Sequence, residues 1–370
     1  MKKLIISTCG TSLLTNKAPF EVQKILRETA NSSEKELTEE QKKAIDLQVS
    51  KQEEMLSNAT FKQARELSAE LNGILGIYNN KLALDISQDM HFLIRTDTYQ
   101  GQEAARLVEK WLSNKDMMVQ IQNIEGLTTK SFEDFHRGIL ELVKWIEEII
   151  PGYEKSGFHI VFNLVGGFKS VQGYLNTLGM FYADEIVYIF EASSSELIRI
   201  PRLPIHLDPE GVVKKQLNIF RRMSIYGEIP LNEVEGIPES LLDKRENRVG
   251  LSIWGQAVWG RSKEEYYKKE LLPPPHQQIK YGNNFAKAVS EYIGTDRAIL
   301  INKRIDDLGI FLNSNRKYNP NSLDFKPLQG KPLRESTHEC DAWSDKDAKR
   351  IFCHWEENTL VLDTIGPKLK

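Results

Sequence analysis

The strongest constraint on the fold is a regular alternation of short apolar runs and amphipathic helices. Apolar strands are predicted at 91–96, 117–124, 158–165, 185–190 and 197–203, and an earlier one at 3–8. Helices are predicted at 101–112, 131–150 and 168–183, with Ser131 as an N-cap and Pro151 just past the end of the second. Because strand–helix–strand repeats place helices against a parallel sheet, residues 1–205 are predicted to form a doubly wound, mostly parallel α/β domain.

Length and charge limit the classes of protein that this chain can belong to. With 370 residues it is long enough for two or more domains. Its 40% hydrophobic and 27% charged residues are typical of a globular protein. The net charge of −3 argues against a general affinity for nucleic acid, so any basic site must be local.

Cysteine usage and the N-terminus favour a cytoplasmic setting. The three cysteines form no C-x-x-C pair, which argues against a zinc ribbon and against a disulfide framework. The start MKKLIISTCG has too short an apolar run for a signal peptide, and no run approaches the length of a membrane span. The expectation is a cytoplasmic protein with no membrane partner.

Three further regions differ in composition from the alternating pattern. Residues 17–80 are densely charged and are predicted to form a solvated helical insertion. A connector of undefined shape is predicted at 206–275, ending at the proline-rich LLPPPHQQ. Residues 276–370 are predicted to be a small α+β domain with helices at 283–293 and 298–313. Its strands are expected at 322–328, 338–343, 348–357 and 358–366, the last two forming a hairpin.

Polar and glycine residues are expected to gather at one edge of the N-terminal sheet. Parallel sheets bind ligands where strand carboxyl ends meet helix N-termini, which here are segments 9–16, 95–101 and 163–170. In NLVGGFKS (163–170) the glycines let backbone N–H groups approach an anion, Lys169 adds a positive charge, and Asn163 suits a base edge or a ribose. The alternative is a tight turn with a surface lysine. Neither G-x-G-x-x-G nor Walker A is present, so an ordinary dinucleotide or ATP site has little support.

The motifs TCGTSLLTN (8–16) and NLVGGFKS resemble those of the CARF domains of type III CRISPR systems. CARF domains are Rossmann-like, dimeric sensors of cyclic oligoadenylates, and the resemblance covers residues 1–205 apart from the charged insertion. The family usually has a hydroxyl residue where this chain has Val165, which removes one phosphate donor. The resemblance implies a homodimer activated by a cyclic oligoadenylate, with the cyclic tetra-adenylate favoured, and no other cofactor. The implied ligand-binding residues are Gly10, Thr11, Ser12, Arg95, Thr96, Asn163, Gly166, Gly167 and Lys169.

Cations and histidines concentrate near the C-terminus. Segment 313–334 carries five basic residues against the single acid Asp324, and His338 and His354 each follow an arginine by four positions. Arg350 and His354 have even spacing on a predicted strand, so they should share a face. Imidazoles among guanidinium and ammonium groups suit metal-free RNA cleavage, in which the 2′-OH attacks the neighbouring phosphate. The alternative is that the histidines are structural and the charges serve solubility.

The order of two helices and four strands over 280–370 resembles the RelE toxin superfamily, whose members cleave mRNA in the ribosomal A site without metal. A CARF domain fused to a RelE domain is the arrangement of the CRISPR-associated mRNA interferases. This resemblance implies an endoribonuclease that binds mRNA and the ribosome and inhibits translation. The implied catalytic residues are Arg334, His338, Arg350 and His354, followed by Lys326 and Lys331.

Other effector types stay open at this point. A HEPN ribonuclease would need Arg199 and His206 on one helix, which the prolines between them exclude. A metal-dependent PD-(D/E)xK nuclease would use Asp324-Phe325-Lys326 with Asp306 or Asp307. A non-enzymatic regulator that senses a cyclic nucleotide is the third alternative, and the CARF pocket itself could degrade the ligand.

Overall fold

The structure is a computed structural model that describes residues 1–79, 84–190, 196–202, 209–329, 333–345 and 347–368. The chain divides into two compact units, Met1–His206 and Leu207–Lys370. The predicted insertion lies in the first unit, and the predicted connector and the predicted RelE-like domain share the second.

Unit 1 is built on a six-stranded sheet with the order β3-β2-β1-β4-β5-β6, and its predicted mostly parallel character is confirmed. Only β6 runs antiparallel to its neighbour. The strands are β1 (Lys3–Thr8), β2 (Met90–Arg95), β3 (Met118–Asn123), β4 (His159–Asn163), β5 (Glu185–Ile189) and β6 (Leu197–Pro201). The helices are α1 (Ser12–Thr15), α2 (Phe20–Glu28), α3 (Glu39–Ser57), α4 (Phe61–Leu67), α5 (Ala69–Ile77), α6 (Tyr99–Ser113), α7 (Phe132–Lys155) and α8 (Lys169–Tyr182), with 3-10 turns η1 (Glu34–Glu36) and η2 (Leu84–Gln88).

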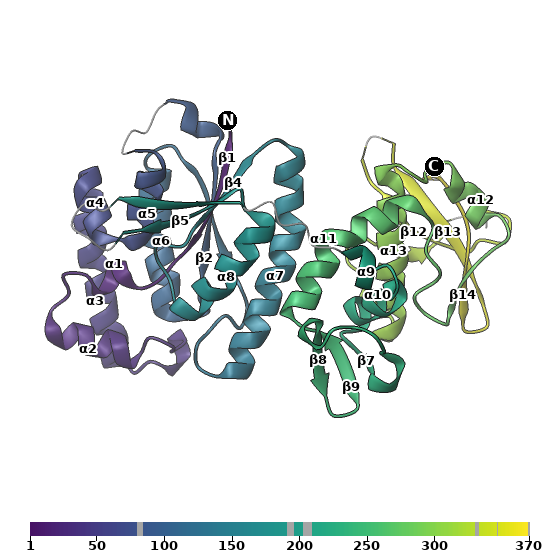
Figure 1. Ribbon diagram of the computed structural model, residues 1–370, viewed down its shortest axis with the longest axis horizontal. Helices are drawn as coiled ribbons and strands as arrows, with labels where there is room; N and C mark the ends of the chain where they lie inside the picture. The colour runs from purple at the N-terminus through teal and green to yellow at the C-terminus, as the bar shows by residue number, and fades with distance from the viewer. Residues whose placement is uncertain (80–83, 191–195, 203–208, 330–332, 346, 369–370) are drawn as a thin grey trace. The chain divides into compact units, whose positions relative to one another are not determined.

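Helices cover both faces of this sheet because its central strands are apolar on both sides. Figure 1 shows α5 and α6 on one side and α7 and α8 on the other. Ile5 and Leu93 face the first layer, while Phe92 packs edge-on against Trp145 of α7 on the second. β1 lies between β2 and β4, so the chain reverses its direction of winding there, which is where such sheets bind ligands.

The charged segment is largely helical over its described residues 17–79, but the prediction of a solvated arm is wrong. The inner faces of α3, α4 and α5 belong to the main core of unit 1. Gln48 and Gln52 are buried on α3 because their side-chain amides donate to the carbonyls of Leu14 and Asn16. The many charged residues lie on the outer surface. The composition of the segment therefore suggested a fully solvated helix, although its inner face is packed. A second correction concerns Pro151, which lies inside α7 rather than past its end.

The first half of unit 2 has its own small core. It contains α9 (Pro209–Val212), α10 (Leu217–Tyr226), a three-stranded sheet and α11 (Ile253–Lys269). The sheet has the order β7-β9-β8, with β7 (Glu228–Pro230), β8 (Leu242–Arg245) and β9 (Arg248–Leu251), and 3-10 turns η3 (Leu231–Glu233) and η4 (Glu239–Leu241). Phe220, Trp259 and Tyr267 pack with Ile299 of the following helix, α13 (Asp296–Asn313), so this small core also includes part of the C-terminal region.

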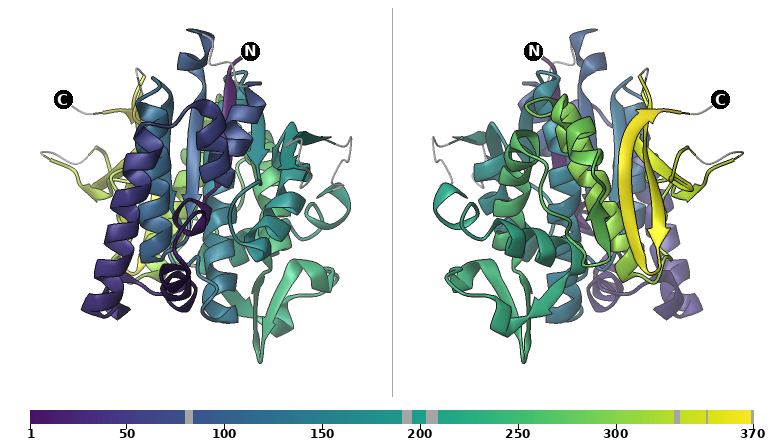
Figure 2. Two further views of the ribbon diagram at one scale, coloured as in Figure 1. Left: turned by 90° about the vertical axis from the view of Figure 1, so that its left-hand side faces the viewer. Right: turned by 90° about the vertical axis from the view of Figure 1, so that its right-hand side faces the viewer.

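The C-terminal part is a five-stranded sheet with the order β10-β14-β13-β12-β11, packed on two helices. The predicted hairpin is present, with a turn at 357–358 in which Glu357 has a φ of 53°. The long β13–β14 hairpin is yellow in Figure 2. β10 was not predicted, and it pairs parallel to β14. The elements are β10 (Ile279–Tyr281), α12 (Phe285–Ser290), α13 (Asp296–Asn313), β11 (Lys326–Pro327), β12 (His338–Trp343), β13 (Lys349–Glu356) and β14 (Thr359–Pro367).

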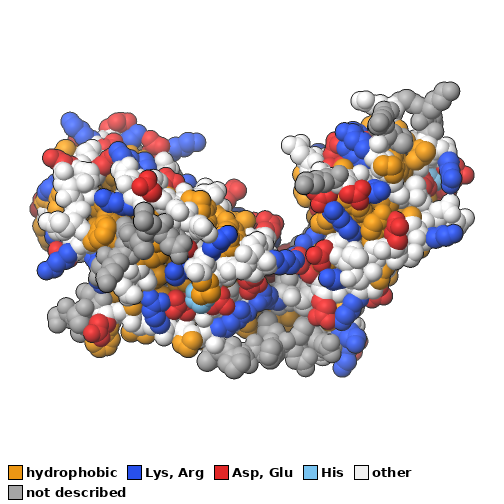
Figure 3. Space-filling view, turned by 90° about the horizontal axis from the view of Figure 1, so that it is seen from above, with side chains coloured by type: hydrophobic (Ala, Val, Ile, Leu, Met, Phe, Trp, Pro, Cys, Tyr) orange, Lys and Arg blue, Asp and Glu red, His pale blue; other side chains and the backbone are white. Residues whose placement is uncertain are grey.

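The surface charge and the hydropathy of the helices bear on two expectations from the sequence, a mixed surface charge and no membrane-spanning helix among the described residues. Basic and acidic side chains intermingle over the face shown in Figure 3, as a net charge of −3 predicts. Among the described residues, no helix combines the length and the apolar character that a membrane span requires.

Candidate functional site

Residues from the ends of β1 and β4 form a tight group that we call the sheet-edge cradle, because the register sets Ser7 beside Asn163. A Cβ on Gly10 would lie 2.9 Å from the backbone N of Gly167. Gly167 has a φ of 97°, and a Cβ there would meet Thr8. Only glycine allows this close approach of two backbone segments. The cradle consists of Thr8, Gly10, Ser12, Asn163, Gly166 and Gly167.

Glu70 of α5 fills the cradle and was missed by the sequence analysis. It is buried, and its Oε1 accepts a hydrogen bond from the backbone N–H of Gly10 at 2.7 Å. Its Oε2 accepts from the Ser12 hydroxyl at 3.2 Å and from the Ser68 hydroxyl at 2.7 Å. The N–H group predicted to meet a phosphate therefore already binds a carboxylate. Only the fold of segment 17–80 onto the sheet reveals this contact.

Asn163 is fully buried beneath α5. Its side-chain amide donates to Ser7 Oγ at 3.0 Å and to the carbonyl of Glu70 at 3.2 Å. Its Oδ1 has no hydrogen-bond partner, and a Cβ on Gly73 would lie 2.0 Å from this oxygen. Asn163 is thus part of the cradle, but α5 covers it.

The other predicted ligand-binding residues lie near the cradle on separate segments. Arg95 ends β2 and donates to the carbonyl of Thr96, and burial lowers its pKa. The buried Thr96 hydroxyl contacts that of Thr98, which caps α6. Thr11 precedes α1, and the exposed Lys169 begins α8.

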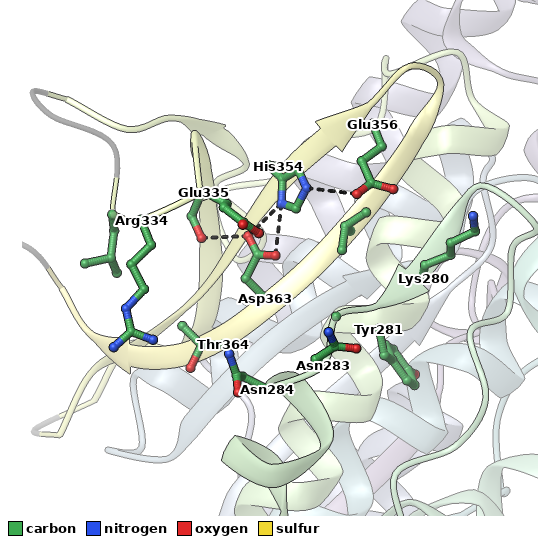
Figure 4. A pocket seen from close by; sticks show the side chains of 14 residues that line it. Lys280, Tyr281, Asn283, Asn284, Arg334, Glu335, His354, Glu356, Asp363 and Thr364 are labelled. Atoms are coloured by element: carbon green, nitrogen blue, oxygen red, sulfur yellow. Dashed lines mark hydrogen bonds and ion pairs between the residues drawn. The ribbon is translucent and has the colours of Figure 1, made fainter.

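Unit 2 contains a second candidate site, which we call the C-terminal pocket. It has a volume of about 640 Å³ and lies beside β14. Figure 4 shows Lys280, Arg334, His354, Glu356 and Asp363 among the side chains that line it. The lining residues are Lys280, Tyr281, Gly282, Asn283, Asn284, Leu333, Arg334, Glu335, Ser336, His354, Glu356, Val361, Asp363 and Thr364.

A histidine–carboxylate pair is the main chemical feature of the C-terminal pocket. His354 Nδ1 lies 2.9 Å from Asp363 Oδ1, and this hydrogen bond raises the pKa of His354. The hydroxyl of Ser336 donates to Asp363 Oδ2 at 2.6 Å, which fixes the carboxylate. His354 Nε2 lies 3.5 Å from Glu356 Oε1. Since Asp363 binds Nδ1, Nε2, which faces Glu356, is the nitrogen that can transfer a proton.

A β-bulge places Asp363 in this pocket. The pairing of β13 and β14 shifts between Phe352 and Cys353, so Asp363 is an extra residue with no Cα partner. Such a residue changes the direction of its side chain relative to strict alternation. The register, and not the sequence spacing, therefore brings Asp363 to His354.

The structure does not bring all the predicted catalytic residues together. His338 pairs with Cys353, the neighbour of His354, so the two histidines point to opposite faces of the sheet. His338 stacks on Phe325 with ring centroids 5.4 Å apart, and burial lowers its pKa. Among the predicted catalytic residues that the structure describes, only Arg334 and His354 line the pocket.

The remaining predicted cations are engaged elsewhere. Arg350 is buried and bonds Asp324 at 2.9 Å and Asp341 at 2.6 Å. Lys326 also pairs with Asp324. Lys331 lies outside the described residues. The guanidinium of Arg350 is therefore buried and engaged by two carboxylates rather than exposed to a substrate.

The carboxylates of the metal-nuclease alternative are also engaged. Asp306 bonds Arg221 and Tyr267, and Asp307 pairs with Arg304. Within the described ranges, no three His, Cys, Asp or Glu residues cluster in a way that could hold a metal ion. For the HEPN alternative, Arg199 lies on β6 and His206 lies outside the described residues.

Comparison with known proteins adds a family match for unit 1. The family model described as "CRISPR-associated protein (Cas_APE2256)" matches residues 65–203. The solved structure of Enterococcus italicus Csm6 bound to cyclic hexa-2′-fluoro-hexa-dAMP aligns at 12% identity, covering 85% of this chain and 56% of its own. The chain thus spans little more than half of that protein, and the TM-score of 0.30 is too low to carry an argument. No curated protein gives a significant match.

Proposed function

We propose that this chain is a cyclic oligoadenylate-activated ribonuclease of type III CRISPR immunity. The family match over 65–203 and the motifs at 8–16 and 163–170 support a CARF-type sensor in unit 1. The activator is a cyclic oligoadenylate, with the tetramer favoured. Its even-fold symmetry suits the two-fold axis of a homodimer, in which each copy offers the same donors.

The observation that carries the nuclease proposal is the His354–Asp363 pair beside a pocket that also contains Arg334 and Lys280. Asp363 raises the pKa of His354 and so favours the protonated imidazolium, which is the form that a general acid needs. Glu356, next to His354 Nε2, is placed to act as the base. Arg334 and Lys280 would stabilise the charge on the phosphate.

In this mechanism the Glu356 carboxylate takes the proton of the RNA 2′-OH as the 2′-oxygen attacks phosphorus. The bond from phosphorus to the 5′-oxygen breaks, and His354 Nε2 gives its proton to the leaving oxygen. The products are a 2′,3′-cyclic phosphate and a 5′-hydroxyl end. No metal is needed for this step, because the attacking group belongs to the RNA itself. His338, Arg350 and Lys326 have no part in it, since they lie outside the pocket.

The proposed substrate is mRNA on translating ribosomes, by the resemblance of residues 280–370 to RelE toxins. Cleavage there would inhibit translation during infection. The test is cleavage of ribosome-bound and naked mRNA by the full chain in EDTA, with and without each cyclic oligoadenylate. We expect activated cleavage of the ribosome-bound mRNA. Replacing His354 by Asn should cost ~10²–10⁴-fold in rate, the usual contribution of one proton-transfer group.

His338→Gln is the matched control, because this histidine faces the other side of the sheet. It should retain cleavage within a few-fold. Loss of cleavage in EDTA would favour the metal-dependent nuclease. If no cyclic oligoadenylate changes cleavage of either substrate, the proposed function is wrong. Equal cleavage of ribosome-bound and naked mRNA would show that the ribosome is not part of the substrate.

A further inference from the structure

A carboxylate of the protein itself occupies the sheet-edge cradle. Glu70 is 1% exposed and contacts the cradle through the Gly10 N–H and the Ser12 hydroxyl. A Cβ on Gly166 would lie 2.1 Å from Glu70 Oε1, so the carboxylate lies directly against that glycine. It therefore uses the same amide, hydroxyl and open glycine surface that would receive a phosphate oxygen.

The negative charge of Glu70 has one local source of stabilisation, because Glu70 lies in the first turn of α5, where the helix dipole favours an acid by about 0.3–1 kcal/mol. Its hydrogen-bond donors are all neutral, and in the part of the chain that the structure describes it forms no ion pair with Lys, Arg or His. Burying a carboxylate without a cation is costly. A glutamine could accept the same bond from Gly10, and the hydroxyls of Ser12 and Ser68 can rotate to suit it. These hydrogen bonds therefore do not require a negative charge, and the carboxylate brings to the cradle the same charge that a phosphate oxygen would bring.

We propose that Glu70 competes from within the protein for the anion site of the cradle. A phosphate of the ligand enters only when the Glu70 carboxylate leaves, since both need the Gly10 N–H and the surface of Gly166. The ligand class, a phosphodiester-linked adenine nucleotide, rests on the proposed function. The buried Oδ1 of Asn163, which lacks a partner under Gly73, would become available by the same displacement of α5.

Displacement of Glu70 would also move neighbouring strands, because α5 packs on β4, β5 and β6. A Cβ on Gly76 would lie 2.8 Å from the Leu197 side chain of β6, so the backbone of α5 touches this strand. The carbonyl of Ile77 accepts a bond from Arg199, also on β6, at 3.3 Å. β6 is the last strand of unit 1. A ligand that binds only the state with Glu70 displaced increases the population of that state. Because α5 contacts β6, the position of β6 should change with it.

The test is the affinity of the full chain for cyclic tetra-adenylate, measured by calorimetry for the wild type and Glu70→Gln. The neutral amide should hold the Gly10 N–H more weakly than the carboxylate does, so less of the protein is held in the filled state and binding should tighten by roughly tenfold. RNA cleavage without activator should also rise. Glu66→Gln is the control: it makes the same charge change on α4, where Glu66 is exposed and 3.9 Å from Lys17. It should alter neither affinity nor basal cleavage.

A second variant and a simpler ligand separate the possible failures. Glu70→Asp keeps the charge but shortens the reach to Gly10, so it should also tighten binding. Unchanged or weaker binding by both variants would overturn the proposal, since Glu70 would then be a ligand contact or only structural. If no form binds any cyclic oligoadenylate, the proposed function fails. The competition by Glu70 is then tested with inorganic phosphate as the ligand. Phosphate should then raise the melting temperature of Glu70→Gln more than that of the wild type, and equal shifts would overturn the proposal.

Discussion

At the scale of single residues, the charge of His354 is the property on which the proposed chemistry depends. Asp363 raises the pKa of His354, so the imidazolium that acts as acid persists above the usual value of about 6.5. Activity should fall as the pH rises through this raised pKa. Asp363→Asn removes the charge that holds the proton, so the falling limb should move to lower pH. At pH 8 we expect a loss on the order of tenfold, part of the ~10²–10⁴-fold contribution of a general acid.

The same pair predicts how stability depends on pH. The folded pKa of His354 is raised, so its contribution to the free energy of unfolding is complete below the unfolded value of about 6.5. That contribution is lost as the pH rises through the folded pKa. NMR titration of the His354 ring in the wild type and Asp363→Asn gives both pKa values. Ser336→Ala, which leaves the Nδ1 bond intact, should move the pKa less. An identical pKa in the wild type and Asp363→Asn would contradict this account.

The individual contacts of both sites were only partly predictable. The motif at 163–170 and the expected sheet predicted that Gly10, Asn163 and Gly167 would meet, because parallel strands end at one edge. Glu70 and Asp363 were beyond prediction, since one arrives on a helix from a charged segment and the other through a bulge. Arg350 and His354 lie on the predicted strand, and the fold adds the contacts of Arg350 with Asp324 and Asp341.

At the scale of elements, one buried ion pair joins α10 to α13. Arg221 is 1% exposed, and its Nη2 lies 2.7 Å from Asp306 Oδ1. Another of its nitrogens donates to the carbonyl of Pro273 at 2.6 Å. Arg221→Ala leaves Asp306 buried without its cation and should lower the free energy of unfolding by ~3–5 kcal/mol. Urea titration followed by tryptophan fluorescence measures this, because Trp259 packs in the same core.

Arg222 provides the matched comparison because it is the next residue on α10. It pairs with Glu233 at the surface, where both side chains are about one third exposed. Arg222→Ala should therefore cost only ~0–1 kcal/mol. Similar losses for the two variants would show that burial does not decide the strength of these pairs.

Elements were predicted well where periodicity is strong and poorly where tertiary pairing decides. The strands and helices between 90 and 190 follow from the alternation of apolar runs and amphipathic segments. β10 has only three residues, and it is a strand only because β14 offers a free edge. The predicted strand 322–328 shrinks to β11, since only Lys326 and Pro327 pair with β12. α7 continues past Pro151 because its apolar face stays in contact with the core through Ile150 and the ring of Tyr153.

At the scale of the whole molecule, the chain consists of two compact units, and the hydrophobic clusters of unit 2 share α13. The sequence predicted that the α/β domain ends near residue 205. It could not show that residues 209–272 pack with α13 instead of forming an independent connector. Two compact units predict two unfolding transitions rather than one. Unit 1 contains Trp111 and Trp145, and the other four tryptophans lie in unit 2, so both transitions are visible by fluorescence.

The two transitions should respond to different changes. Cyclic tetra-adenylate at about 100 times its dissociation constant should stabilise unit 1 by ~2.7 kcal/mol, because only the folded sensor binds it. For a unit of this size, that raises its melting temperature by roughly 5–10 °C. Arg221→Ala should lower the transition of unit 2 and leave the ligand-dependent shift of unit 1 unchanged. Differential scanning calorimetry of the full chain, with and without ligand, separates these effects. A single transition that both changes move together would show that the units unfold as one, and the assignment of sensing to unit 1 would then need the direct binding measurement.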